Sequence, residues 1–82
     1  MEEIYDPPAF VPGDRVRSVR AVRNDGTVRD AAMGEVLVAE GEDGYVRSVG
    51  TYLNRFYVYG VDFVARGRIV GMRTHEIAAM ED

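Results

Sequence analysis

Residues 56–64, with the sequence FYVYGVDFV, constrain the fold more than any other segment of this 82-residue chain. Successive side chains of a β-strand point to opposite faces of the sheet. One face of this segment carries Tyr57, Tyr59, Val61 and Phe63. The other face carries Asp62, whose charge favours solvent, so we expect the aromatic face to pack against the core. Asp62 is then expected to pair with an arginine across the sheet.

Four other segments have the valine-rich or aromatic composition of strands. They are residues 15–22, 36–38, 45–53 and 68–72. In the first and third of these, valines recur every three residues rather than every two, which indicates a bulge or a sharp bend. We place the second bulge near Gly50. The residues HEIAAM, which follow Thr74, predict a short helical segment capped by the Thr74 side chain.

Short strands, turns rich in glycine and proline, and almost no helix indicate an all-β domain. We expect a small SH3-like barrel of about five strands that ends in a short C-terminal helical turn, because closure removes exposed sheet edges. Three prolines exclude a central strand from residues 1–12, so these residues are expected to form an extended N-terminal arm. Residues 13–82 form a single domain with a small core, since a chain of this length buries only about 60% of its unfolded surface.

Charge is distributed unevenly along the chain, whose ten basic residues are all arginine and whose net charge is −4. Residues 13–30 carry a net charge of +2, and residues 44–73 carry +4. Residues 31–43 carry −4, and both ends of the chain are acidic. If these segments fold onto different faces, the surface is dipolar, which favours a protein partner with complementary patches.

The residue types that carry most enzyme chemistry are scarce in this sequence. Cysteine is absent, which excludes thiolate nucleophiles and cysteine ligands of zinc or iron–sulfur clusters. His75 is the single histidine, and we expect it to have a surface or capping role, because its acidic neighbour Glu76 would not share a helix face with it. The glycines form no phosphate-binding pattern. We therefore expect no catalytic residues, no cofactor and no metal, and we do not expect an enzyme.

The sequence also lacks the features of secreted and membrane proteins. Its N-terminal segment has neither the basic start nor the apolar core of a signal peptide, and no apolar run approaches the roughly 20 residues of a membrane span. We expect a cytoplasmic protein with no membrane partner. A basic cluster ends at the first residue of the RNDGT segment, but an isoelectric point of about 4.9 disfavours nucleic acid as the partner. The cluster consists of Arg15, Arg17, Arg20 and Arg23.

Two predicted loops are candidates for contact with a protein. RNDGT, residues 23–27, opens an irregular stretch that is too long for a simple hairpin loop, so we interpret it as a shaped loop. The second loop, at residues 54–55, is flanked by Tyr52 and Phe56, and aromatic residues beside arginine are frequent in interface hot spots. The predicted contacts are Arg23, Asn24, Asp25 and Thr27 on the first loop and Thr51, Tyr52, Asn54 and Arg55 around the second.

Five pieces of the sequence also match a known family in order and spacing. They are PGDRVR (12–17), VRNDGT (22–27), GEVLVAEGEDGYVRSVGTYL (34–53), YVYGVDF (57–63) and RIVGMRTHEI (68–77). Together they resemble the NifZ family of nitrogen-fixation accessory proteins, over residues 10–78. The resemblance implies a non-enzymatic, chaperone-like factor that assists maturation of the nitrogenase molybdenum–iron protein by helping to complete its P-cluster.

The implied partners are the immature molybdenum–iron protein and other nitrogen-fixation accessory factors. Without cysteine, this chain is not expected to hold a cluster itself. Two other functions remain open at this point. A small barrel of this kind could bind nucleic acid, or it could be a permanent, non-catalytic subunit of a larger enzyme.

Overall fold

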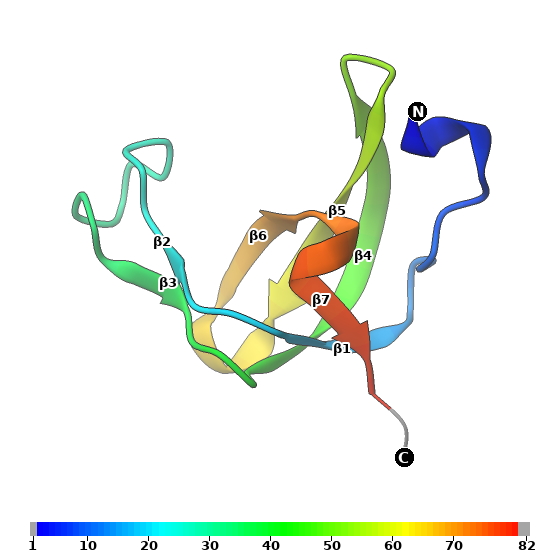
Figure 1. Cartoon of the computed structure of the whole chain (residues 1–82). Coiled ribbons are helices and arrows are strands. Elements are labelled where there is room, and N and C mark those ends of the chain that lie inside the picture. Colours follow the sequence, from blue (N-terminus) through cyan, green and yellow to red (C-terminus); the bar gives the residue numbers. More distant parts are fainter. Residues whose placement is uncertain (1, 81–82) are drawn as a thin grey trace.

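The computed structural model describes residues 2–80, and these residues fold almost entirely into strands (Figure 1). The strands are β1 (Arg15–Ser18), β2 (Val22–Arg23), β3 (Val36–Val38), β4 (Asp43–Tyr52), β5 (Phe56–Phe63), β6 (Arg68–Met72) and β7 (Ile77–Ala79). Short 3-10 turns form η1 (Glu3–Tyr5), η2 (Val64–Arg66) and η3 (Thr74–Glu76). The predicted all-β class is therefore confirmed.

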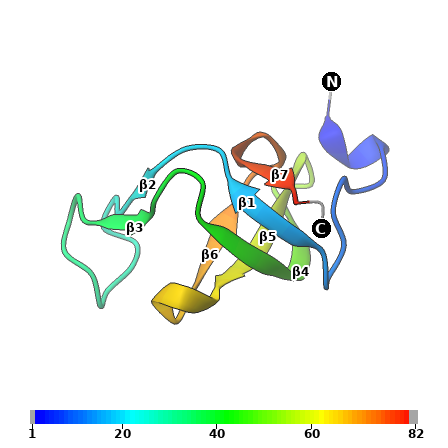
Figure 2. The same cartoon turned by 90° about the horizontal axis from the view of Figure 1, so that it is seen from below.

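Five of the strands form one antiparallel sheet in the order β6-β5-β4-β1-β7, and β2 pairs with β3 in a separate small sheet. Figure 2 shows β2 and β3 extending away from the main sheet as a projection. The edges of the main sheet are β6 and β7, and no ladder joins them within residues 2–80. Five strands are thus found in one sheet, whereas its closure into an SH3-like barrel stays a prediction.

The core forms on the face of β5 that the alternation predicts. Tyr59, Val61 and Phe63 are fully buried, and Tyr57 is partly buried. They pack with Val16, Val38, Val46 and Met72, which are fully buried residues from four other strands. On the opposite face, a carboxylate oxygen of Asp62 lies 2.9 Å from the guanidinium of Arg47 on β4. The predicted pair between Asp62 and an arginine is confirmed.

The predicted strand over residues 15–22 is confirmed only for residues 15–18, because the chain bends after Ser18, in agreement with the bend that the valine spacing indicated. The Ser18 side chain is fully buried, and its hydroxyl donates a hydrogen bond to the carbonyl oxygen of Arg20. The chain then leaves the main sheet and enters the small one. Val16 and Val22 therefore lie in different sheets, which explains why their spacing fits no single strand.

The predicted bulge in β4 exists, but it lies at Arg47 rather than at Gly50. The register between β4 and β5 shifts between Val46 and Ser48, which makes Arg47 the extra residue. After this shift, half-buried Val49 lies on the core side of the strand. Gly50 has open space around it, since a Cβ atom at this position would meet nothing within 4 Å, so neither a bulge nor a close backbone approach requires the glycine.

The predicted helical segment over residues 75–80 is also wrong beyond its first turn. A single 3-10 turn, η3, leads directly into β7, which pairs with β1. The predicted cap, Thr74, is not the capping residue: a Glu76 carboxylate oxygen accepts the backbone N–H of Arg73 at 2.8 Å. Burial of Ile77 against the sheet outweighs the helix preference of so short a segment.

The N-terminal arm lies beside the β4–β5 hairpin (Figure 1). The Tyr57 hydroxyl donates to the carbonyl oxygen of Asp6 at 2.6 Å, and the Tyr59 hydroxyl accepts the backbone N–H of Ala9 at 3.1 Å. Phe10 packs edge-on against Tyr59, with 5.4 Å between the ring centroids. These contacts fix the arm against β5 and bring its acidic start close to the turn between β4 and β5.

Candidate protein-binding surfaces

The RNDGT segment opens an irregular stretch over residues 23–35, which we call the RNDGT loop. This loop is organised around one buried side chain. Asn24 is only 3% exposed. Its amide nitrogen donates to the carbonyl oxygens of Val28 (2.9 Å), Ala31 (2.9 Å) and Ala32 (3.2 Å). Its amide oxygen accepts the backbone N–H groups of Gly26 (3.0 Å) and Val28 (3.1 Å). Asn24 therefore replaces the strand ladder that this part of the backbone lacks.

The other predicted residues of this loop also bond within it. The Asp25 carboxylate accepts the hydroxyl (2.8 Å) and the backbone N–H (3.1 Å) of Thr27. The bond from the Thr27 hydroxyl and, to a smaller extent, the bond from its backbone N–H lower the pKa of Asp25 below its usual value, because both favour the charged carboxylate. The Arg23 guanidinium donates to the carbonyl oxygen of Gly34 at 2.8 Å across the loop. Arg23 and Thr27 thus help to shape the loop, and their contact with a partner stays a prediction.

A shallow hollow of about 300 Å³ separates this loop from β6. Arg23, Asp25 and Thr27 line the loop side of the hollow. Ile69 and Gly71 of edge strand β6 line the opposite side, and Ile69 is largely exposed. The loop residues therefore form one wall of a concave surface and do not stand alone in solvent.

The hairpin tip, residues 51–55 between β4 and β5, has an unusual backbone. Leu53 and Asn54 both have left-handed conformations, with φ angles of 54° and 52°. The Arg55 backbone N–H donates to the Tyr52 carbonyl oxygen at 3.0 Å and closes the turn. Asparagine adopts this conformation readily, but leucine does so at a cost of about 1–2 kcal/mol. This backbone conformation places the apolar side chain of Leu53, which is 70% exposed, at the end of the hairpin.

The predicted aromatic anchor pair is only half exposed. Tyr52 and Phe56 lie with ring centroids 5.4 Å apart, and Tyr52 is 56% exposed. The Phe56 ring is partly covered by the guanidinium of Arg73, whose central carbon lies 3.5 Å from the ring centroid. This distance is that of a cation–π contact. Tyr52 is thus the accessible member of the pair, and Phe56 supports an arginine.

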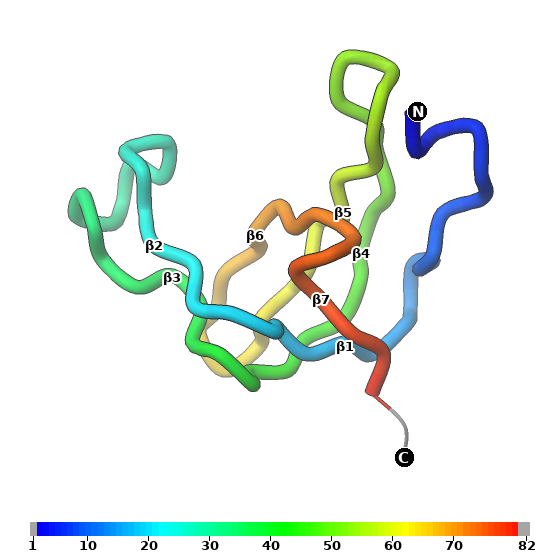
Figure 3. The backbone as a smooth tube through the Cα atoms, viewed as in Figure 1, coloured from blue at the N-terminus to red at the C-terminus, as the bar shows by residue number. Residues whose placement is uncertain are grey.

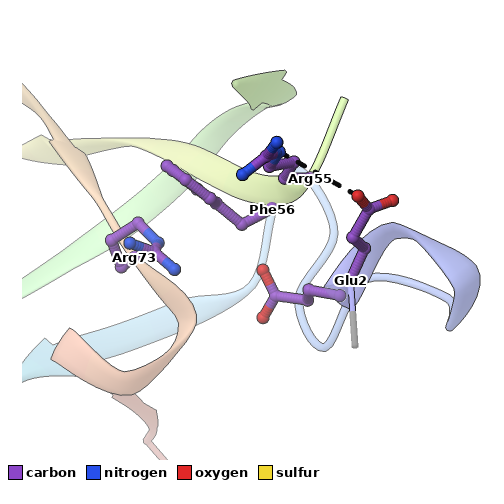
Figure 4. A pocket seen from close by; sticks show the side chains of 5 residues that line it. Glu2, Arg55, Phe56 and Arg73 are labelled. Carbon is purple, nitrogen blue, oxygen red and sulfur yellow. Dashed lines mark ion pairs between the residues drawn. The ribbon is translucent and has the colours of Figure 1, made fainter. Parts of the chain in front are cut away.

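The arginine pocket, defined by Glu2, Glu3, Arg55, Phe56 and Arg73, lies where the N-terminal arm meets the start of β5 (Figure 4). Its volume is about 530 Å³. Figure 4 shows Arg55 and Arg73 on either side of the Phe56 ring, with Glu2 reaching toward Arg55 from the arm. Glu2 and Arg55 form an ion pair with 3.9 Å between the charged groups.

Glu3 fixes the arm at the rim of this pocket. Its carboxylate accepts the backbone N–H of Tyr57 at 2.7 Å. Hydrogen bonding from Thr74 and then from the Tyr57 backbone lowers the pKa of Glu3 below its ordinary value of 4.5, and the nearby charge of Arg73 adds to this effect. The carboxylate of Glu3 is therefore ionised and already bonded near neutral pH.

The structure does not bring the eight predicted contact residues into one site. The RNDGT loop extends from β2 and β3, whereas the hairpin tip extends from β4 and β5, on different parts of the molecule (Figure 3). No hydrogen bond or ion pair found in residues 2–80 joins the two loops. The tip instead shares a pocket with the N-terminal arm. The predicted site consists of two separate surfaces.

Sequence reasoning missed three contributors to these surfaces. Leu53 was omitted because nothing in the sequence LNR signals a left-handed leucine. Arg73 lies far from the tip in the sequence, and only the pairing of β5 with β6 brings the two together. The acidic residues of the arm were counted in the charge of the N-terminal segment, but their position beside Arg55 could not be read from the sequence.

The side chains that could hold a metal ion do not cluster in the described part of the chain. His75 is exposed on η3. Within residues 2–80, no three histidine or acidic side chains gather in a way that could hold a metal ion. No helix in the same range has the length and apolar character needed to cross a membrane.

Comparison with known proteins places most of the chain in one family model. A model described as "NifZ domain" matches residues 7–79. A protein of Sinorhizobium fredii (strain NBRC 101917 / NGR234), provisionally named NifZ, is 49% identical over 78 residues, which cover 95% of this chain and 72% of that protein. A protein of Rhodobacter capsulatus, also provisionally named NifZ, is 46% identical over 70 residues, with 85% and 90% covered.

Some relatives are longer than this chain. "Protein NifZ" of Klebsiella pneumoniae is 43% identical over 70 residues, which cover 85% of this chain but 47% of that protein. No solved structure matches the chain. The matched region of the family model contains both the RNDGT loop and the hairpin tip, whereas Glu2 and Glu3 lie before it.

Proposed function

We propose, because this chain belongs to the NifZ family, that it is a non-enzymatic accessory protein of nitrogen fixation that works by binding another protein. The family is assigned to nitrogen fixation, so the partner is expected among nitrogenase components and the factors that assemble them. The proposed location is the cytoplasm. The proposed fold is an SH3-like barrel, which the five-strand order and the short turn between β6 and β7 support.

The specific step that we propose is maturation of the nitrogenase molybdenum–iron protein, through help in completing its P-cluster. The chain has no cysteine to bind iron, so its contribution would be a chaperone-like contact with the immature protein. Other nitrogen-fixation accessory factors are proposed as additional partners.

The observation that carries the protein-binding proposal is the hairpin tip. Leu53 is held outward in a left-handed conformation that a leucine does not favour, and largely exposed Tyr52 lies beside it. Local backbone strain persists where the surrounding structure imposes it, and it is concentrated at functional positions. Exposed apolar and aromatic side chains on a fixed turn are well suited to act as anchors in a protein interface.

The two alternatives receive less support. Two arginines of the basic cluster that would favour nucleic acid already bond within the chain: Arg15 pairs with Asp43 at 3.0 Å, and Arg23 donates a hydrogen bond to the carbonyl oxygen of Gly34. A continuous positive surface is what phosphate binding needs. A permanent enzyme subunit would bury a large apolar face, whereas the exposed apolar side chains of this chain are scattered over several elements, including the hairpin tip, η2 and β6.

The proposal is tested by capture of immature molybdenum–iron protein, which lacks a complete P-cluster, on the immobilised chain. We expect wild-type protein to retain it and the double variant Y52A/L53N to lose most of the binding. An exposed arginine outside both surfaces provides the control variant, R20A, which should bind like the wild type. In cells, deletion of the gene should lower the P-cluster content of nitrogenase. No capture by the wild type, together with an unchanged P-cluster content, overturns the proposal.

A further inference from the structure

The arginine pocket brings together two cationic side chains that come from different strands. Arg55 immediately precedes β5, and Arg73 immediately follows β6. The Phe56 ring lies between them in Figure 4 and fixes Arg73 through the cation–π contact at 3.5 Å. The planar guanidinium of Arg73 is thus held by packing, which lowers the entropy lost when it binds an anion.

Arg73 has a hydrogen-bond donor that nothing in the described chain satisfies. Its Nε atom is buried and makes no hydrogen bond within residues 2–80. No carboxylate in this range lies within the 4.0 Å of an ion pair with Arg73 either. A buried charged donor without an acceptor is costly, so the pocket favours an incoming group that accepts hydrogen bonds.

The arm's own carboxylates occupy the rim of the pocket without satisfying this donor. Glu2 lies 3.9 Å from Arg55, and the two side chains are 41% and 67% exposed, so the pair is long and solvated. Exposed pairs of this kind contribute little to stability and are easily replaced. Glu3 is already bonded to the Tyr57 backbone. The arm therefore places negative charge at the pocket without giving the Nε atom of Arg73 a partner.

We propose that the arginine pocket binds a glutamate or aspartate side chain from an acidic segment of a partner protein, and that Glu2 competes with this segment. The pocket has a volume of about 530 Å³, which accommodates a carboxylate side chain, and its two arginines supply the positive charge that attracts one. Arginine forms two parallel hydrogen bonds with a carboxylate, which is the geometry that Arg55 and Arg73 can offer. The biological role of this contact rests on the proposed function, but the binding itself does not.

Competition from Glu2 sets a minimum for the negative charge of a segment that binds the pocket. A partner segment must bring more negative charge than the single weak Glu2 contact that it displaces. Because both arginines are partly accessible to solvent, binding should weaken as ionic strength rises and screens the charges. Salt dependence therefore distinguishes this contact from an apolar one at Tyr52 and Leu53.

The test measures fluorescence anisotropy of a labelled octaglutamate peptide titrated with the full chain, with octaglutamine as the uncharged control. We expect octaglutamate to bind and octaglutamine not to bind, with at least about tenfold weaker binding of octaglutamate at 0.5 M than at 0.05 M salt. R55A should weaken binding about tenfold or more, because it removes one charge-assisted partner. R73K keeps the positive charge over Phe56 but lacks Nε, so it should also weaken binding.

The variant E2Q tests whether Glu2 competes with the peptide for the arginine pocket. It removes the competing charge with little change in shape, so octaglutamate should bind about two- to fivefold more tightly. R20A should leave the affinity unchanged, since Arg20 lies outside the pocket. Equal binding of both peptides, an unchanged affinity in both R55A and R73K, or weaker binding by E2Q each overturn the proposal. Capture of immature nitrogenase with no peptide binding would overturn this inference and leave the proposed function standing.

Discussion

The RNDGT loop and the hairpin tip each connect two antiparallel strands, but they expose very different side chains. In the loop, the side chain of Asn24 satisfies the backbone, and the polar groups of its neighbours are consumed by internal hydrogen bonds. In the tip, the strand ladders of β4 and β5 satisfy the backbone, so the side chains are not needed to hold it. Tyr52 and Leu53 can therefore face solvent. A loop supported by its own side chains therefore has fewer of them left to contact a partner.

The largest expected effect comes from N24A, which removes the side chain that supports the loop. Several backbone groups lose their partner at a buried position, so the free energy of unfolding should fall by about 2–3 kcal/mol. Chemical denaturation measures this change, and amide hydrogen exchange should show faster exchange in residues 24–35. The exposed variant R23A should have a much smaller effect. A stability loss in N24A no larger than in R23A would mean that the two regions are supported in the same way.

L53N should act in the opposite direction. Asparagine tolerates the left-handed conformation better than leucine, so relief of strain should raise the free energy of unfolding by about 1 kcal/mol. The same variant should bind immature molybdenum–iron protein less well, because the apolar anchor is lost. Thermal unfolding and the capture assay measure the two effects. A variant that is more stable but binds normally would show that Leu53 is strained without serving as an anchor.

The smallest expected effect is the loss of one hydrogen bond in each region at low pH. The bond of Glu3 lies beside the hairpin tip, and the bond of Asp25 lies in the RNDGT loop. The pKa of Glu3 is lowered in the folded protein, so its stabilising bond to Tyr57 is present above the ordinary value of 4.5 and is lost as pH falls through the lower folded pKa. The amide NMR signal of Tyr57 should titrate in this range below 4.5, and E3Q should abolish the titration. Asp25, whose pKa is also lowered, should give the same response at the Thr27 amide below its ordinary value of 3.8. Titration of either amide above these values would contradict the assigned bonds.

Local sequence patterns predicted the parts of the fold that depend on neighbouring residues. The alternation in β5 identified the core face and the outward Asp62, because both follow directly from strand geometry. The valine spacing in β4 signalled a bulge, but not its position at Arg47, which the pairing with β5 determines. The valine spacing in residues 15–22 also indicated a bulge or bend, but not that the chain changes sheets after Ser18, and the strand at Ile77 was missed, since both depend on contacts between distant segments.

In the candidate surfaces, too, features that depend on neighbouring residues were predicted, and features that depend on distant contacts were not. RNDGT was correctly recognised as a shaped loop, because asparagine, aspartate and glycine have strong local preferences. The burial of Asn24 could not be inferred, since the carbonyl groups that it bonds come from a backbone path with no sequence signature. The arginine pocket was not predicted, because Glu2, Arg55 and Arg73 meet only after the sheet has formed.

The position of β1 also has a consequence for synthesis on the ribosome. β1 (residues 15–18) lies between β4 and β7, so one of its two partners is made of residues 77–79. Until those residues leave the exit tunnel, one side of β1 has unpaired backbone groups and the core lacks Ile77. One side of β1 in the nascent chain is therefore open to strand pairing with neighbouring polypeptides until residues 77–79 emerge. A high share of such long-range contacts also predicts comparatively slow folding.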